Sequence, residues 1–357
     1  AFLLGSLTEE IFMDCPAGME HEDDECLLLT KTIYGLVQSA RQYSIRFAEA
    51  LKNMGFEPCP SDPCLYKGWY RGKPVFISSY VDDNYCVGTR EALEWVVSEI
   101  PKQGLNITVE RNTKDYLSCE VVMNKEKTKA WIGQPHLIKK LKKGFWEKVS
   151  SLQRYKTPGT PGQGLVLAKT PEEKIDEERH SNYRTGTGML LFLIKHSRPE
   201  ISNAVRELSK CLSAPTMHAY KEMLRVIKYV LDTPTRGLKM EPTKTNEWVI
   251  LLYTDSDWAG DKDSRKSVTG YLLFVCGVLI CWRSKSQPVV SLSSTEAETY
   301  ALSEAVKEVP FVVQLLLFMG IKVELPIQIK VDNMGAVHMV NNNTSSARTR
   351  HMDTRVK

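Results

Sequence analysis

Apolar runs from Trp248 to the end of the chain follow an order that leaves few folds open. Two of them, 268–275 and 278–283, are separated by Cys276-Gly277 and predict a β-hairpin. Strands are expected at 249–255, 268–275, 278–283 and 327–331, and helices at 293–319, with a break near Pro310, and at 333–340. This β-β-β-α-β-α order predicts a mixed sheet covered by helices.

The residues from 183 to 231 show the apolar spacing of helices instead. Pro199 and Pro215 divide this stretch, and Pro234-Thr-Arg-Gly237 ends its last helix. The preceding segment, Thr157-Pro-Gly-Thr-Pro-Gly-Gln-Gly164, has the composition of a linker. The chain therefore divides into an N-terminal part, a helical middle and a β-rich C-terminal part.

Length and composition are typical of a globular protein. The chain has 357 residues, of which 42% are hydrophobic and 25% are charged, and this excludes a collagen-like or wholly disordered chain. At roughly 100–200 residues per domain, the length predicts two or three domains. No apolar run reaches the roughly 18–20 residues of a membrane span, so we expect no membrane segment.

Charge is distributed in blocks, although the net charge of the whole chain is only +4. Residues 9–25 carry eight acidic residues and no lysine or arginine, whereas 136–156 carries seven basic residues and one acidic residue. Phe145, Trp146 and Tyr155 are interleaved with these bases, a combination that suits contact with a nucleic-acid backbone. A solvated helix face explains the same pattern, so both interpretations stay open at this point.

Two adjacent acidic residues, Asp82 and Asp83, lie between apolar runs in Ser78-Ser-Tyr-Val-Asp-Asp-Asn-Tyr-Cys-Val-Gly88. The pattern predicts a hairpin with the acids at its tip. Adjacent carboxylates repel each other unless a cation lies nearby, and a divalent ion that prefers oxygen ligands meets that need. A simple polar turn is the alternative for an isolated Asp-Asp pair.

A second group of acidic residues is spread along the C-terminal part. Asp255 and Asp332 each end a predicted strand, Glu296 and Glu298 open the long helix, and Asp353 lies near the C-terminus. Acidic residues at strand ends and at a helix start can converge on one edge of a sheet. Three or four such carboxylates would bind two magnesium ions about 4 Å apart and activate water for attack on a phosphodiester. Capping and turn formation are the alternative roles.

Helical spacing distinguishes the two glutamates. Both Ser293-Ser-Thr-Glu296 and Thr295-Glu-Ala-Glu298 match a capping box. Glu298 is in line with Ala301 and Ala305 on the apolar face of the helix. We therefore expect Glu298 to bind metal and Glu296 to cap the helix.

Several motifs follow one another along the chain in an order that resembles a known family. They are Ala1-Phe-Leu-Leu-Gly-Ser-Leu-Thr-Glu-Glu-Ile-Phe-Met13, Lys31-Thr-Ile-Tyr-Gly-Leu-Val-Gln-Ser-Ala-Arg41, Tyr80-Val-Asp-Asp83, Arg198-Pro-Glu-Ile201 with Ala204-Val205, Thr254-Asp-Ser-Asp-Trp-Ala-Gly260, Arg265-Lys-Ser-Val-Thr-Gly-Tyr271, Ser293-Ser-Thr-Glu-Ala-Glu298, Asp332-Asn333 and Arg348-Thr-Arg-His-Met-Asp353. Together they resemble the reverse transcriptase–ribonuclease H (RNase H) region of copia-type LTR retrotransposon polyproteins. The resemblance covers nearly the whole chain.

The resemblance implies an α+β protein of three parts. Residues 1–156 would form the palm, fingers and thumb of a reverse transcriptase, truncated at the N-terminus. Residues 157–246 would form a linker and a helical connection. Residues 247–357 would form an RNase H-like domain, a mixed sheet with helices that is truncated at the C-terminus.

The resemblance also implies roles for individual residues. The catalytic metal ligands would be Asp82 and Asp83 for nucleotidyl transfer, and Asp255, Glu298, Asp332 and Asp353 for RNase H. Phe2 would lie under the incoming sugar, and Gly35 and Gln38 would lie near the nucleotide and the template. Nucleic acid would be bound by the thumb lysines Lys139, Lys140, Lys142 and Lys143. Each active site would take two Mg²⁺ ions, with Mn²⁺ as the alternative.

The implied activity is RNA-directed DNA synthesis coupled to cleavage of the RNA strand in RNA–DNA hybrids. The implied partners are an RNA template, a DNA primer, deoxynucleotides, the hybrid itself, and the protease and integrase segments of the polyprotein. Hybrid recognition should depend on backbone and 2′-hydroxyl contacts rather than on base sequence. The family location is cytoplasmic, in a virus-like particle, with the nucleus as an alternative.

Three departures from the family pattern bear on activity. The family's first palm aspartate would lie about four residues before Ala1, so we expect the chain as given to polymerise poorly or not at all. Tyr116-Leu-Ser-Cys-Glu120 lacks the family's glycine in the primer-gripping turn, and the chain ends four residues after Asp353. Two hypotheses follow: an enzyme that keeps RNase H activity, and an inactive relic that folds and binds nucleic acid.

Overall fold

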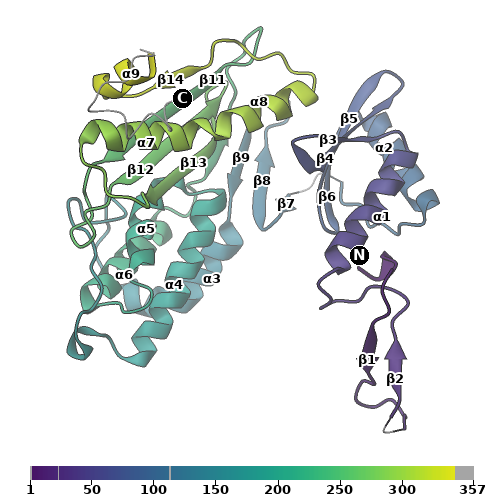
Figure 1. The fold of residues 1–357 in the computed structure, drawn as a ribbon, viewed down its shortest axis with the longest axis horizontal. Coiled ribbons are helices and arrows are strands. Elements are labelled where there is room, and N and C mark those ends of the chain that lie inside the picture. Colours follow the sequence, from purple (N-terminus) through teal and green to yellow (C-terminus); the bar gives the residue numbers. More distant parts are fainter. Residues whose placement is uncertain (1, 23, 112–113, 342–357) are drawn as a thin grey trace. The chain divides into compact units, whose positions relative to one another are not determined.

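The computed structural model describes residues 2–22, 24–111 and 114–341 (Figure 1). They fall into two compact units, one formed by the chain up to Asn112 together with Phe318–Gly320 and the other formed by the rest. Both units combine sheets with helices. The predicted α+β class is therefore confirmed.

A four-stranded antiparallel sheet in the order β3-β4-β5-β6 forms the centre of the first unit. Val75 and Ile77 are fully buried and alternate with the less buried Pro74, Phe76 and Ser78 along β5, as expected for a strand with one face on the core. The elements are η1 (Phe2–Leu4), α1 (Ser39–Asn53), β3 (Glu57–Cys59), β4 (Asp62–Tyr70), β5 (Lys73–Tyr80), β6 (Asp83–Val87), α2 (Arg90–Glu99) and η2 (Ile100–Gln103). Phe47 and Leu51 of α1 complete this core.

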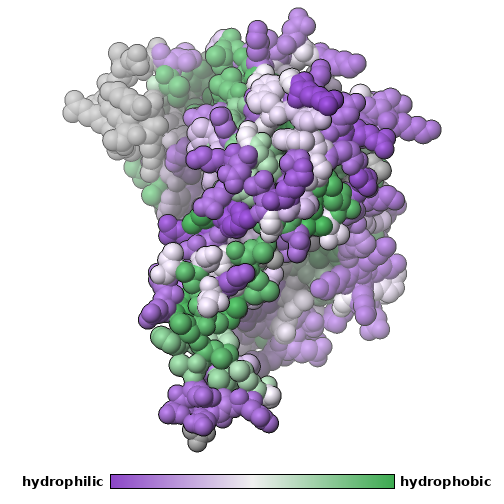
Figure 2. Space-filling view, turned by 90° about the vertical axis from the view of Figure 1, so that its right-hand side faces the viewer, coloured by the Kyte–Doolittle hydropathy of each residue, from purple (hydrophilic) through white to green (hydrophobic). Residues whose placement is uncertain are grey.

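The acidic block of the sequence spans a separate hairpin in this unit, and its second half lies in the hairpin loop. Its strands are β1 (Phe12–Asp14) and β2 (Cys26–Leu28), which pair antiparallel. Phe12 and Leu28 are more than half exposed. Figure 2 shows hydrophilic residues gathered at the end of the hairpin and hydrophobic residues over its strands. The described acidic residues between β1 and β2 thus lie in a solvated loop.

Four helices build the larger core of the second unit. They are α3 (Pro135–Val149), α4 (Glu177–His196), α5 (Ser202–Lys210) and α6 (Met217–Asp232), with the short turns η3 (Pro171–Glu173) and η4 (Pro199–Ile201). Leu141, Leu190 and Ile227 are fully buried where α3, α4 and α6 meet. Asp176 and Thr216 cap α4 and α6 by accepting backbone N–H groups. None of the described helices combines the length and apolarity that crossing a membrane requires.

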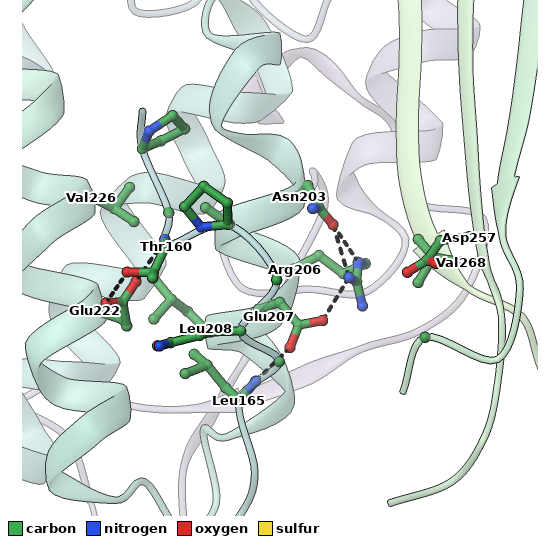
Figure 3. Close-up of a pocket in the computed structure, with 18 of the residues that line it drawn as sticks. Thr160, Leu165, Asn203, Arg206, Glu207, Leu208, Glu222, Val226, Asp257 and Val268 are labelled. Carbon is green, nitrogen blue, oxygen red and sulfur yellow. Dashed lines mark hydrogen bonds and ion pairs between the residues drawn. The ribbon is translucent and has the colours of Figure 1, made fainter. Parts of the chain in front are cut away.

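The segment 157–165 has no helix or strand and is held against this helical core. Thr160 donates its N–H and hydroxyl to the Glu222 carboxylate at 3.1 and 2.7 Å, and Leu165 donates its N–H to Glu207 at 2.9 Å (Figure 3). A cavity of about 500 Å³ lies between the segment, α5, α6 and the start of the C-terminal sheet. Asp257 lines that cavity. The linker is therefore fixed to α5 and α6 rather than free of them.

Two further sheets belong to the second unit. One is antiparallel in the order β10-β9-β8-β7 and consists of β7 (Asp115–Tyr116), β8 (Cys119–Met123), β9 (Ala130–Gly133) and β10 (Leu238–Met240). The other has the order β13-β12-β11-β14 and consists of β11 (Ile250–Asp257), β12 (Val268–Val275), β13 (Val278–Ser286) and β14 (Gln328–Lys330). Its strands pair antiparallel except for β11 and β14, which are parallel. The predicted mixed sheet is confirmed.

Helix α7 (Ser294–Val306) packs on β11 and β12, and α8 (Glu308–Phe318) and α9 (Met334–Asn341) follow it (Figure 1). The break expected near Pro310 is present and lies at Lys307, three residues before the proline. Pro310 is the third residue of α8, where no backbone N–H is needed for an intrahelical bond. The proline therefore marks the first turn of a new helix.

Candidate metal centre

Three carboxylates from distant parts of the chain meet in the second unit. Asp255, Glu298 and Asp332 each offer an oxygen, and these oxygens lie within 4.8 Å of one another. Asp255 and Asp332 are exposed, whereas Glu298 is buried. The three come from a strand, a helix and the end of a second strand, so only the tertiary fold brings them together.

The parallel pairing of β11 and β14 aligns the two aspartates. Tyr253 pairs with Lys330, and Asp255 and Asp332 each follow two residues later. Parallel strands end at the same edge of a sheet, so the two side chains reach the same edge. Asn333 then accepts the N–H of Ala336 at 3.0 Å, which caps α9 directly after the site.

Glu298 has one carboxylate oxygen bound and the other free. Oε1 accepts the backbone N–H of Ser256 at 2.9 Å. Oε2 is buried and has no hydrogen-bond partner within the described part of the chain. Burial is the main cause that raises the pKa of Glu298 to about 7; the charges of Asp255 and Asp332 act in the same direction, and the Ser256 hydrogen bond opposes them. This set of oxygen donors, one of them buried without a partner, fits a divalent cation.

Glu296 caps the N-terminus of α7, which is the role that helical spacing predicts for it. Its carboxylate accepts the N–H of Leu292 at 2.7 Å, and its own N–H donates to Ser293 Oγ at 3.1 Å. These bonds close the N-terminus of α7. Glu296 is not among the three grouped carboxylates, and Asp353, the fourth expected ligand, lies outside the described residues.

The Asp82-Asp83 pair lies at the tip of a tight hairpin in the first unit. Tyr80 pairs with Asp83, which leaves Val81 and Asp82 as the two turn residues. Val81 has a φ of +56°, a strained conformation for a β-branched residue. Both aspartates are exposed. The turn therefore presents two carboxylates to solvent at some cost in backbone strain.

Tyr43 of α1 packs near Phe2 and lies within the electrostatic influence of Asp82. The rings of Phe2 and Tyr43 lie 6.4 Å apart, centre to centre. Burial raises the pKa of Tyr43, and the charges of Asp82 and Tyr34 raise it further. Sequence reasoning did not select Tyr43; its position one helical turn before the buried Phe47 indicates only a core residue.

Gly35 and Gln38 lie in the turn that leads into α1. Gly35 has a φ of +104°, in the left-handed region that favours glycine. Gln38 occupies the N-cap position of α1 and donates its side-chain N–H to Glu9 at 3.4 Å. Both residues belong to the same unit as Asp82.

The predicted nucleic-acid lysines share the solvent face of α3. Lys139, Lys140, Lys142 and Lys143 are all exposed. Leu141 and Phe145 of the same helix are buried in the helical core. Trp146 is 42% exposed, and the ammonium group of Lys142 lies 4.7 Å from its ring centre. This face combines positive charge with an accessible aromatic ring.

Comparison with known proteins points to one family. A family model described as reverse transcriptase (RNA-dependent DNA polymerase) matches residues 1–141. The retrovirus-related Pol polyprotein from transposon TNT 1-94 of Nicotiana tabacum is 30% identical over 364 residues, which cover 99% of this chain and 27% of that protein. The corresponding polyprotein from transposon RE1 of Arabidopsis thaliana is 30% identical over 355 residues, covering 99% of this chain and 23% of that protein.

A shorter relative matches one part of the chain. Secreted RxLR effector protein 161 of Plasmopara viticola is 40% identical over 126 residues, which cover 35% of this chain and 87% of that protein. The chain spans about a quarter of the length of the two Pol polyproteins. It belongs to the retrovirus-related Pol polyproteins of copia-type transposons and contains their reverse transcriptase domain.

Proposed function

We propose that residues 247–357 are an RNase H-like domain that hydrolyses the RNA strand of RNA–DNA hybrids. Asp255, Glu298 and Asp332 would hold divalent cations, with Asp353 as a fourth ligand. The single observation that carries this proposal is the convergence of three carboxylates within 4.8 Å at the edge of a mixed sheet. Three acidic side chains this close repel one another, and a divalent cation removes that cost.

The three carboxylates would have different parts in the reaction. Bound Mg²⁺ ions would lower the pKa of a water molecule and stabilise charge on the scissile phosphate. Asp255 and Asp332 are exposed and would face the substrate. Glu298 is held by the Ser256 N–H at 2.9 Å, which leaves its second oxygen oriented for binding. A rigid ligand on the buried side and two accessible ligands on the open side suit a substrate that binds from solvent.

We propose that residues 1–156 are the palm, fingers and thumb of a reverse transcriptase, the part that would carry out RNA-directed DNA synthesis in the parent polyprotein. The match of the reverse transcriptase family model to 1–141 supports this assignment. Asp82 and Asp83 would bind the metal ions, and the exposure of both carboxylates on one turn supports that role. Phe2 would contact the sugar of the incoming nucleotide, and its packing near Tyr43 agrees with this position.

The lysine face of α3 would bind the template, the primer and the hybrid. Phosphate contacts from lysines supply affinity without base specificity. The helix is anchored by a buried face, so its lysines project from a fixed support. The segment 157–246 would act as the connection between polymerase and nuclease parts.

The RNase H proposal is tested on the full chain with a labelled RNA–DNA hybrid and Mg²⁺. We expect cleavage of the RNA strand, and a loss of at least about 100-fold in the Asp255→Asn variant. Glu304→Gln is the matched control, because Glu304 lies on α7 and pairs with the exposed Lys307. Equal cleavage by Asp255→Asn and the unchanged chain would refute the proposal. Binding of the hybrid without any cleavage would favour the inactive relic.

A further inference from the structure

The side chain of Gln287 is buried close to the candidate metal centre but has no part in the proposed chemistry. Gln287 directly follows β13 and is 1% exposed. Its backbone N–H donates to Ser267 O at 2.8 Å, which fixes the start of the loop that leads to α7. A polar side chain buried this completely has to be satisfied by hydrogen bonds.

The Gln287 amide joins three separate elements at one point. Its Nε2, which carries two N–H groups, lies within hydrogen-bond distance of three acceptors: Ser256 Oγ on β11 at 3.3 Å, Thr269 Oγ1 on β12 at 3.2 Å and Ala297 O on α7 at 3.0 Å. Its Oε1 accepts the Ser291 hydroxyl at 3.0 Å. Because the Ala297 carbonyl can only accept, the NH₂ group has to face it, and this sets the orientation of the amide.

Two of these partners are direct neighbours of metal-centre residues. Ser256 follows Asp255, and Ala297 precedes Glu298. Ser256 also donates its backbone N–H to Glu298 at 2.9 Å. A movement of α7 away from β11 would therefore break the Gln287 hydrogen bonds and change the separation of the two carboxylates.

We propose that Gln287 is a positioning residue that holds Asp255 and Glu298 at the separation a divalent cation requires. The proposal rests on the proposed function, because it takes the three grouped carboxylates as a metal centre. Without the amide, repulsion between the carboxylates favours a wider spacing, and cation binding then has to close the site again. Groups that orient metal ligands typically contribute 10–100-fold to metal affinity.

The test measures the Mn²⁺ dissociation constant of the full chain by calorimetric titration, with Mn²⁺ as the probe ion. The variant is Gln287→Met, which keeps the volume of the side chain and removes its hydrogen bonds. We expect Mn²⁺ affinity to fall by about 10-fold or more. Hybrid cleavage should require a higher Mn²⁺ concentration, while the cleavage rate at saturating Mn²⁺ is largely kept. A general loss of stability would not change the first quantity and leave the second unchanged.

Gln134→Met is the matched control. Gln134 is also 1% exposed and accepts a hydrogen bond, from Ser197 Oγ at 2.8 Å, but it lies at the start of α3. Its replacement should lower the melting temperature and leave the Mn²⁺ dissociation constant unchanged. If Gln287→Met does not fold, Thr269→Val removes one acceptor of the same amide and should weaken Mn²⁺ binding in the same direction.

The outcomes separate this inference from the proposed function. The positioning role is overturned if folded Gln287→Met binds Mn²⁺ with unchanged affinity, and the metal centre itself is then unaffected. Thr269→Val serves the same purpose if Gln287→Met does not fold. Mn²⁺ binding that is absent from the unchanged chain, or equal in Asp255→Asn, overturns both. The chain could also bind Mn²⁺ without cleaving hybrid. If Gln287→Met then weakens Mn²⁺ binding, the positioning role is supported and the nuclease proposal fails.

Discussion

Ser256 donates its backbone N–H to Glu298 Oε1 at 2.9 Å, and so connects the strand that carries Asp255 to the helix that carries Glu298. The bond leaves Glu298 Oε2 buried without a hydrogen-bond partner among the described residues. A buried charge with one unsatisfied oxygen destabilises the fold unless a proton or a cation is bound. The stability of the second unit should therefore depend on pH and on divalent metal.

Replacing Glu298 by glutamine should stabilise the metal-free protein at high pH. The pKa of Glu298 is raised from 4.5 to about 7, so between these pH values the folded state binds more protons than the unfolded state. The contribution of the Glu298 carboxyl to the free energy of unfolding is fully present below pH 4.5 and is lost as pH rises to about 7. In EDTA, Glu298→Gln should melt higher than the unchanged chain at pH 8, with little difference at pH 4.5.

Thermal melts from pH 4.5 to 8 measure this effect. Glu304→Gln on the same helix should show no such pH-dependent difference, because Glu304 pairs with an exposed lysine. A Glu298→Gln difference that is constant with pH would contradict the raised pKa.

Divalent metal should stabilise the full chain through the grouped carboxylates. Binding to the folded state alone raises stability by about 2.7 kcal/mol at a metal concentration of 100 times the dissociation constant. We expect Mg²⁺ or Mn²⁺ to raise the melting temperature at pH 8, and EDTA to reverse the rise. Asp332→Asn should remove most of the shift. A shift that persists in Asp332→Asn would place the stabilising ion elsewhere.

Much of this acidic cluster could be predicted from residue pattern alone. Strand periodicity predicts the strands that carry Asp255 and precede Asp332, although β11 continues past Asp255 to Asp257 instead of ending there. Helical spacing separates Glu298 from Glu296. Local patterns suffice here because each acidic residue lies in a regular element or close to the end of one. The pairing of Tyr253 with Lys330 in parallel strands could not be predicted from the sequence, because it depends on how the chain places β14 beside β11 after two intervening helices.

Other features depended on the tertiary fold. The hydrogen bonds of Gln287 join β11, β12 and α7, and nothing in the local sequence marks that glutamine. The linker composition of 157–164 correctly predicts the absence of helix and strand, yet Glu222 and Glu207 hold the segment in place. Side chains remote in sequence decide these cases, so periodicity and composition could not reveal them.

The exposed lysines of α3 should control affinity for RNA–DNA hybrid. Replacing Lys139, Lys140, Lys142 and Lys143 by glutamine should weaken binding, because each phosphate contact releases condensed counterions. The slope of log affinity against log salt should fall by about 1 for each lysine that contacts a phosphate. Fluorescence anisotropy between 50 and 200 mM salt measures both quantities.

The control for the lysine experiment is Lys125→Gln with Lys127→Gln. These residues are exposed in the loop between β8 and β9 of the same unit, and we expect them to leave the salt slope unchanged. Unchanged affinity and slope after all four replacements on α3 would identify that face as a solvated helix surface.

Two glycines of α4 should respond oppositely to alanine. A Cβ at Gly186 would lie 2.4 Å from Met223 Sδ and 3.1 Å from both Ile227 and Phe145, whereas a Cβ at Gly188 would meet no atom within 4 Å. Gly188→Ala should therefore stabilise the second unit by about 1 kcal/mol through helix propensity. Gly186→Ala gains the same propensity but requires the side chains of Met223, Ile227 and Phe145 to move, at a cost of typically 1–3 kcal/mol for overpacking. It should be neutral or destabilising, with a lower melting temperature than Gly188→Ala.

Because Phe145 belongs to the helix that carries the lysines, the displacement should also weaken hybrid binding in Gly186→Ala. Equal melting temperatures and equal hybrid affinity for the two variants would show that α4 does not need a close approach at Gly186.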